Sequence, residues 1–122
     1  MSNEVGGNGT TKPEAVESEM NKLLQEYNSL EKVMVEDIIK FHNDFEKIHP
    51  FQDGNGRVGR IIMFKECLKN DIVPFIILDT DKMFYYRGLK EYENEKGYLV
   101  DTCLNAQDQY QKIIDEYIKD LL

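Results

Sequence analysis

The sequence predicts an all-α fold, a helical bundle with at most one small β-hairpin at its N-terminus. Two observations lead to this prediction. Five segments place apolar residues at steps of three and four, which is the spacing of amphipathic helices. The one apolar run that looks extended, from Ile72 to Leu78, has no evident strand to pair with. A length of 122 residues corresponds to a single domain, residues 1–122.

The first eleven residues, rich in Gly, Asn and Thr, predict a loop or an irregular hairpin. The helical core then covers residues 12–122. Thr11 lies three residues before Glu14, with Pro13 between them, which predicts a capping box and a first helix over about 12–29. A second helix, about 34–48, ends before Pro50 because a residue that precedes proline avoids helical geometry.

The rest of the core follows the same logic. A third helix should begin near Arg57 and end at Asn70-Asp71, and Ile72 to Leu78 should then run extended and buried. Asp79 or Thr80 can cap a fourth helix over about 81–95. Gly97 separates that helix from a fifth over about 98–121.

Composition excludes several classes of function. The formal net charge is −8, and an acidic surface repels phosphate backbones, so we expect no nucleic-acid partner. No apolar run approaches the ~20 residues of a membrane span, and no leader pattern is seen, so we expect no membrane partner. The two cysteines, Cys67 and Cys103, form no CxxC pair, which favours buried, inert thiols in a reducing cytoplasm.

The loop between the second and third helices carries the chemistry, in the segment HPFQDGNGRVGR over residues 49–60. Gly54 and Gly56 allow a sharp turn and close approach of a ligand to the backbone. The loop leads into a helix N-terminus, where free N–H groups and the helix dipole favour an anion. Arg57 and Arg60, three residues apart, can present two guanidinium groups to phosphate oxygens.

Two further side chains complete this site. Asp53 supplies one carboxylate, and Mg²⁺ typically binds through one or two carboxylates together with substrate phosphates. His49 has a side chain suited to a general base near neutral pH. The residues therefore indicate phosphoryl or nucleotidyl transfer. No GxxxxGK[ST] loop is present, and the GxGxxG match at 54–59 follows a helix, so it lacks the strand that a Rossmann site requires.

The segment 49–60 resembles the Fic family signature HPFx[DE]GNGRxxR, with every fixed position matched. The resemblance extends to Val5–Pro13, which is similar to the family's flap, and to Ile72–Phe75 and Tyr85–Tyr86. It implies a Fic-type helical bundle in which residues 1–11 form part of a β-hairpin flap. It also implies transfer of AMP from the co-substrate ATP, with Mg²⁺, to a Ser, Thr or Tyr hydroxyl of a target protein.

The resemblance assigns roles residue by residue. His49 would take the proton from the target hydroxyl, and Asp53 would hold Mg²⁺. The backbone from Gly54 to Gly56 would form the anion hole, and the Asn55 side chain would contact phosphate. Arg57 and Arg60 would hold the terminal phosphates.

Other assignments concern the rim of the site. Phe51 would point inward and anchor the loop, and Tyr86 would contact the adenine. The second adenine contact falls on Glu93 or Asn94, with Asn94 as our assignment. The flap, residues 4–11, would pair with an extended target segment.

The chain also departs from the family pattern. Members normally carry helices before the flap, which we expect to be absent here, and this would expose apolar surface and favour a homo-oligomer. No inhibitory [ST]xxxE[GN] segment occurs within the 122 residues. Two alternatives stay open: a Fic-type enzyme with another donor or reaction (another nucleotide, phosphocholine, AMP removal or kinase-like transfer), and a non-catalytic interaction module. His42 is expected to be a core or boundary histidine, and one of Tyr85 and Tyr86 to pack in the core.

Overall fold

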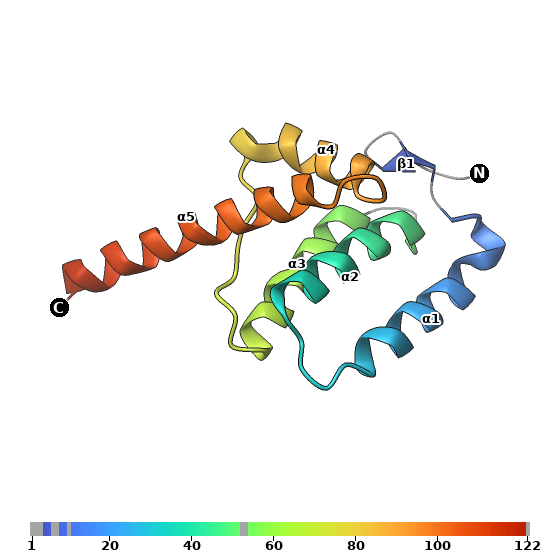
Figure 1. Ribbon diagram of the computed structural model, residues 1–122, viewed down its shortest axis with the longest axis horizontal. Helices are drawn as coiled ribbons and strands as arrows, with labels where there is room; N and C mark the ends of the chain where they lie inside the picture. Colours follow the sequence, from blue (N-terminus) through green and yellow to red (C-terminus); the bar gives the residue numbers. More distant parts are fainter. Residues whose placement is uncertain (1–3, 6–7, 10, 52–53, 122) are drawn as a thin grey trace.

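The computed structural model describes residues 4–5, 8–9, 11–51 and 54–121. Within these ranges the chain is a bundle of α-helices, as the sequence predicts (Figure 1). Helix α1 packs on α2, α2 packs on α3, and α4 packs on α5. The helices are α1 (Val16–Asn28), α2 (Val35–Ile48), α3 (Asn55–Lys69), α4 (Lys82–Glu91) and α5 (Gly97–Leu121), with 3₁₀ turns η1 (Pro13–Ala15) and η2 (Asp79–Asp81).

The N-terminal segment contains a short antiparallel pair, β1 (Glu4–Val5) with β2 (Asn8–Gly9). Glu4 is opposite Gly9 and Val5 is opposite Asn8. The strand β1 contacts α2 and α4. Residues 6–7 and 10 lie outside the described residues, so the flap as a docking element stays a prediction.

The predicted capping box of Thr11 and Glu14 at the start of the first helix is wrong. Residue Lys12 precedes the 3₁₀ turn and no side chain caps it. The Thr11 backbone N–H instead donates to the Lys47 carbonyl oxygen at 3.0 Å, which ties this segment to the end of α2. Pro13 then sets the first turn, and regular α-helix begins only at Val16.

Two other boundaries differ from the sequence prediction. Helix α3 begins at Asn55, two residues before Arg57, because Gly54 adopts the left-handed conformation and lets the helix begin at once. Helix α4 ends at Glu91 rather than near residue 95, in a turn where the Asn94 and Glu95 N–H groups both donate to Glu91.

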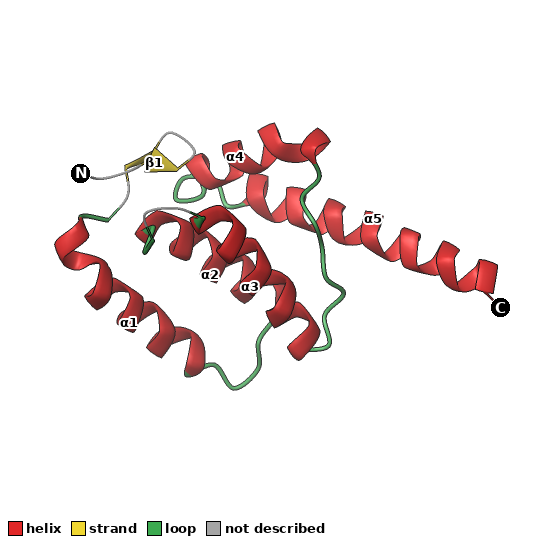
Figure 2. Cartoon of the chain, turned by 180° about the vertical axis from the view of Figure 1, so that it is seen from behind, coloured by secondary structure: helices red, strands yellow, loops and turns green. Residues whose placement is uncertain are grey.

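The segment between α3 and η2 is one long loop rather than a strand (Figure 2). Its middle is buried, since Phe75 is 2% exposed and lies in the main core. The Gln107 side-chain amide donates to the Val73 carbonyl oxygen at 2.8 Å, so α5 satisfies this backbone where a strand partner is missing. The prediction of burial is therefore confirmed for Phe75 and wrong for Ile76 and Leu78, which are 51% and 47% exposed. The polar partner of this backbone is a side chain.

Two apolar clusters form the core. The larger joins α2, α3, α4 and α5, and the smaller joins α1 to α2. The larger contains Ile38, Ile39, Met63, Cys67, Phe75, Tyr85, Leu89, Tyr92, Leu99, Cys103 and Ala106, and the smaller contains Leu23, Phe41, Phe45 and Ile48. Both cysteines are buried free thiols, and burial raises the pKa of Cys67 to about 11 and that of Cys103 to about 12. These values favour the inert thiol form.

The C-terminal half of α5 extends beyond the bundle (Figure 1). Along it Ile113, Tyr117 and Leu121 are each more than 60% exposed. These residues are four apart and therefore share one face of the helix. No helix in the described part of the chain has the length and apolar character needed to cross a membrane.

Helices α4 and α5 approach each other closely at Gly88. A β-carbon at this position would lie 2.7 Å from the Leu99 Cα and 2.9 Å from its Cβ. Because the obstacle is backbone, it cannot rotate away. We expect Gly88→Ala to lower the free energy of unfolding by about 1–3 kcal/mol, the range of overpacked cores. Chemical denaturation measures this change.

Gly97→Ala is the matched control for this prediction. A β-carbon there would meet only the Glu95 carboxylate, at 2.9 Å, which is the far end of a flexible side chain. Equal stability of the two variants would contradict the close packing of α4 on α5.

Candidate active site

The site begins where α2 ends, at His49. This residue adopts left-handed geometry, with φ 55° and ψ 60°, and its N–H donates to the Phe45 carbonyl oxygen at 3.0 Å. Pro50 excludes right-handed helical geometry at the preceding residue, as the sequence predicts, although the conformation adopted is left-handed rather than extended. The His49 Nδ1 atom is buried and has no hydrogen-bond partner among the described residues. The imidazole is therefore held at the edge of the loop with a ring nitrogen uncommitted to protein.

Helix α3 presents a free N-terminus to the same loop. Gly54 precedes it with φ 77°, a conformation that costs a side-chain-bearing residue strain. The first intrahelical bond runs from the Val58 N–H to the Gly54 carbonyl oxygen, at 2.9 Å. The N–H groups of residues 55–57 consequently have no acceptor within the helix, no side chain of the described residues caps them, and no acidic residue lies in the first turn. This turn is suited to an anion.

The Asn55 side chain closes the loop. It is 3% exposed, its Oδ1 accepts the Phe51 N–H at 2.8 Å, and its Nδ2 donates to the Phe51 carbonyl oxygen at 2.6 Å. One Nδ2 hydrogen is left for another acceptor, so the predicted phosphate contact is compatible with this geometry. The loop-closing role itself was not predicted from the sequence.

The prediction that the Phe51 side chain points inward and anchors the loop is wrong. Its ring is 50% exposed and lies beside Phe45, with 6.4 Å between ring centroids. The anchoring comes from its backbone, which the Asn55 amide holds on both sides. Two hydrogen bonds from the Asn55 side chain thus hold the loop, in place of the predicted apolar contact.

The two motif arginines differ in their surroundings. Arg57 is exposed on the first turn of α3, whereas Arg60 is partly buried and folds back over that turn. A β-carbon added at Gly56 would lie 2.9 Å from the Arg60 Nη1 atom. The absence of a side chain at position 56 therefore leaves room for the guanidinium near the anion-binding turn.

A cavity opens beside Arg60 and brings a distant segment to the site. Its lining includes Tyr85 and Tyr86 of α4, together with Arg60, Ile77, Leu78, Asp79 and Lys82. Tyr85 packs in the core and Tyr86 is 40% exposed, so the expectation that one of the pair is buried is confirmed. The structure thus places Tyr86, predicted to contact adenine, in the same cavity as Arg60.

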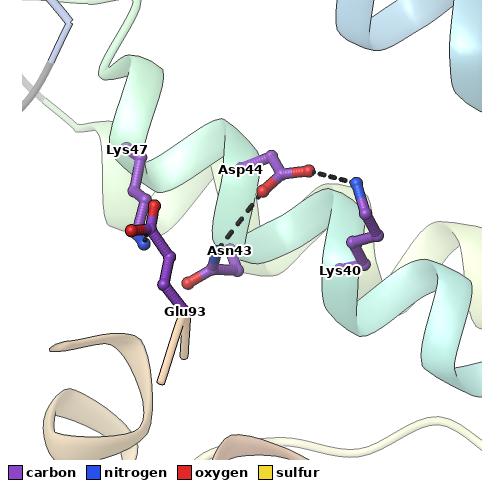
Figure 3. A network of polar contacts seen from close by, with 5 residues as sticks. All are labelled: Lys40, Asn43, Asp44, Lys47 and Glu93. Atoms are coloured by element: carbon purple, nitrogen blue, oxygen red, sulfur yellow. Dashed lines mark hydrogen bonds and ion pairs between the residues drawn. The ribbon is translucent and has the colours of Figure 1, made fainter. Parts of the chain in front are cut away.

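Asn94 does not lie in that cavity. It follows α4 in a turn, and its N–H donates to the Glu91 carbonyl oxygen at 2.9 Å. Its neighbour Glu93 pairs with Lys47 of α2, with 3.1 Å between Oε1 and Nζ (Figure 3). Lys40, Asn43 and Asp44 form a second chain of polar contacts along α2 in the same view. The turn after α4 is therefore tied to the end of α2.

The magnesium prediction falls on Asp53, which lies outside the described residues, as does Gln52. No cluster of three or more metal-binding side chains occurs elsewhere in the described ranges. One carboxylate beside a helix N-terminus that can hold phosphate fits the way Mg²⁺ is usually bound, through few protein ligands and the phosphates of its substrate.

Comparison with known proteins agrees with this geometry. The family model for the Fic/DOC family matches residues 2–67, which include the loop, both arginines and His49. The chain belongs to the Fic/DOC family. It is also 42% identical over 60 residues to a probable protein adenylyltransferase of Aquifex aeolicus (strain VF5). The match covers 49% of this chain and 18% of that relative, so the chain spans a small part of the relative's length.

In this Fic/DOC chain, a buried polar cluster lies between α2 and α3, and the sequence predicts only part of it. His42 and Glu46 are 1% and 3% exposed and lie on one face of α2. Both contact Gly59 of α3, where a β-carbon would lie 3.2 Å from the His42 Cε1 and would collide with the Glu46 Oε1. That oxygen is buried without a hydrogen-bond partner in the described part of the chain.

Burial shifts the pKa values of both groups towards their neutral forms. It lowers the pKa of His42 to about 4, although the Gly59 backbone opposes this shift, and Arg60 lowers the value further. It raises the pKa of Glu46 to about 7, and the nearby Arg60 charge opposes that rise. The expectation of a core His42 is confirmed. A signal for Glu46 was available, since its position one turn after His42 places it on the same face of α2.

Proposed function

We propose that this chain is a protein adenylyltransferase, which transfers AMP from ATP to a hydroxyl side chain of a target protein. The observation that carries the proposal is the first turn of α3. Its free N–H groups follow a left-handed Gly54, Arg57 and Arg60 belong to the first two turns of the same helix, and His49 ends α2 just before this loop. A triphosphate supplies the anion that this turn favours, and the printed name of the Aquifex relative supports the same reaction class.

Each residue then has a defined task. His49 takes the proton from a Ser, Thr or Tyr hydroxyl as its oxygen forms a bond to the α-phosphorus of ATP. The bond between that phosphorus and the bridging oxygen breaks, and pyrophosphate leaves with its electron pair. The N–H groups of residues 55–57 stabilise the charge on the α-phosphate, and Arg57 and Arg60 hold the departing phosphates.

The remaining assignments extend this proposal. Mg²⁺, held by Asp53 and the phosphates, would neutralise charge on the leaving group. Tyr86 would contact the adenine, with Asn94 as the second contact. The target would pair with residues 4–11, where a short antiparallel pair already supplies strand geometry.

The identity of the released product tests this proposal. Purified chain is incubated with Mg²⁺, ATP and a mixture of candidate target proteins, and the small products are separated. We expect pyrophosphate and AMP-modified protein. Release of ADP with phosphorylated protein would instead assign kinase-like transfer, and the absence of any transfer despite a folded chain would favour the interaction module.

Removal of the Asp53 carboxylate should abolish the effect of magnesium on nucleotide binding. We expect Asp53→Ala to bind ATP with the same affinity in the presence of Mg²⁺ or of a chelator, because the metal loses its protein ligand. Isothermal titration under both conditions measures this. Asp101→Ala, an exposed aspartate of α5 outside the cavity beside Arg60, is the matched control and should keep the magnesium dependence. A magnesium dependence that persists in Asp53→Ala would contradict the assignment.

A further inference from the structure

A buried hydrogen bond joins α2 to α4 directly under the proposed phosphate site. The His42 Nε2 atom and the Tyr85 hydroxyl are 2.5 Å apart, and the two residues are 1% and 2% exposed. The Arg60 side chain lies next to the Tyr85 hydroxyl, and both residues line one cavity. Three helices thus contribute one side chain each to a single chain of contacts.

The chemistry of the three groups fixes the direction of these bonds. Arginine can only donate, so the Tyr85 oxygen can serve Arg60 only as an acceptor. The Tyr85 hydrogen is then free to point at the Nε2 of His42, which can accept because burial keeps the imidazole neutral at pH 7. The three side chains therefore form a row in which His42 is buried, Tyr85 lies in the middle and Arg60 lies at the cavity.

The Arg60 end of this row lies at the proposed nucleotide site. Arg60 and Tyr85 line the same cavity, and the Arg60 Nη1 lies close to Gly56 in the first turn of α3. A free arginine side chain samples many rotamers, whereas one bonded to a rigid buried hydroxyl is held in few. The protein contact thus orders the guanidinium before any phosphate arrives.

We propose that Tyr85, supported by His42, is a positioning residue that holds the Arg60 guanidinium at the rim of this cavity for the terminal phosphates of ATP. The identity of the anion rests on the proposed function. The positioning of Arg60 rests on the contacts among the three side chains.

The first test compares nucleotides that differ in their terminal phosphates. Tyr85→Phe removes only the hydroxyl, and we expect Mg-ATP affinity to fall about ten-fold, the value of one hydrogen bond to a charged group. Affinity for AMP, which lacks the phosphates that Arg60 would hold, should stay unchanged. Tyr92→Phe, another buried tyrosine of the same core but outside the cavity, is the matched control and should leave both affinities unchanged.

A double-mutant cycle separates positioning from general damage. If Tyr85 acts through Arg60, Tyr85→Phe should have no further effect on ATP affinity in an Arg60→Ala background. Two substitutions of His42 test whether its role as a hydrogen-bond acceptor matters. His42→Gln, which keeps an acceptor, should hold ATP affinity within about two-fold, whereas His42→Leu should behave as Tyr85→Phe does. Equal losses for ATP and AMP, or additive losses in the cycle, would overturn the proposal.

A ligand-free measurement keeps this inference distinct from the proposed function. The chain has three arginines, Arg57, Arg60 and Arg87, so their Nε–H signals in ¹⁵N NMR can be assigned from single Arg→Lys variants. We expect the Arg60 signal to be ordered in the wild type and to become as mobile as that of the exposed Arg57 in Tyr85→Phe. An unchanged Arg60 signal would refute the positioning role, while failure of the wild type to bind ATP would count against the proposed function alone.

Discussion

His49→Ala should abolish transfer of AMP while ATP affinity stays within a few-fold of the wild-type value. The proposed base acts on the hydroxyl of the target and makes no contact with the nucleotide. Loss of a general base typically lowers the rate by ~10²–10⁴-fold. Transfer assays give the rate, and isothermal titration gives the affinity of the same protein samples.

The structure supplies a control for this variant. His49 ends α2 in left-handed geometry, which alanine adopts at a cost, so His49→Asn, with a residue that tolerates that geometry, should be equally inactive and more stable. Loss of ATP binding in both variants would mean that His49 shapes the loop rather than acting as a base. Recovery of activity in His49→Asn would exclude the base role altogether.

Glu46→Gln should change the pH dependence of stability, because Glu46 is a buried carboxyl. Burial raises the pKa of this carboxyl to about 7 in the folded chain, against 4.5 for the ordinary group. Between these values the folded state binds more protons than the unfolded state, so this group's contribution to stability is lost as the pH rises from about 4.5 to 7. The variant should therefore gain roughly 3 kcal/mol relative to wild type over this window.

The contribution of His42 to stability should change with pH in the opposite direction. Its pKa falls to about 4 in the folded chain, so its contribution to stability is lost as the pH falls from 6.5 to 4. His42→Gln should consequently gain stability relative to wild type in the acid direction, by a similar roughly 3 kcal/mol. In the wild-type chain the two slopes oppose each other and largely cancel.

Denaturant unfolding at closely spaced pH values between 4 and 8 measures both effects. Glu17→Gln is the control, because Glu17 is exposed on α1 and should give a constant difference from wild type. A difference between Glu46→Gln and wild type that does not vary with pH would show that the Glu46 carboxyl ionises as it does in water.

Much of this fold follows from local rules. The apolar spacing predicted the five α-helices of the described residues, and Pro50 and the Asn70-Asp71 pair predicted where α2 and α3 end. The boundaries that moved depend on contacts between distant residues. Thr11 bonds the end of α2 rather than capping α1, and the turn after α4 is held by Lys47, neither of which a local pattern encodes.

The site shows the same division. A contiguous motif predicted His49, Gly54, Arg57 and Arg60, because their spacing along one loop and one helix turn fixes their neighbourhood. The approach of Tyr86 to Arg60 depends on the packing of α4, and the sequence could suggest it only through the resemblance. The buried cluster of His42, Glu46 and Tyr85 forms where α2 meets α4. The sequence predicted a core or boundary His42, whereas Glu46 resembles an ordinary surface residue until the packing is known.

The proposed reaction breaks the bond next to the α-phosphate of ATP. No ion pair engages Arg60 in the described part of the chain, and the 122 residues contain no [ST]xxxE[GN] segment, so this chain should modify itself when given Mg²⁺ and ATP. Its incubation with ATP labelled on either the α- or the γ-phosphate, with His49→Ala as the blank, tests the claim directly. We predict label on protein from α-labelled ATP and none from γ-labelled ATP; protein labelled from the γ-phosphate alone would contradict it.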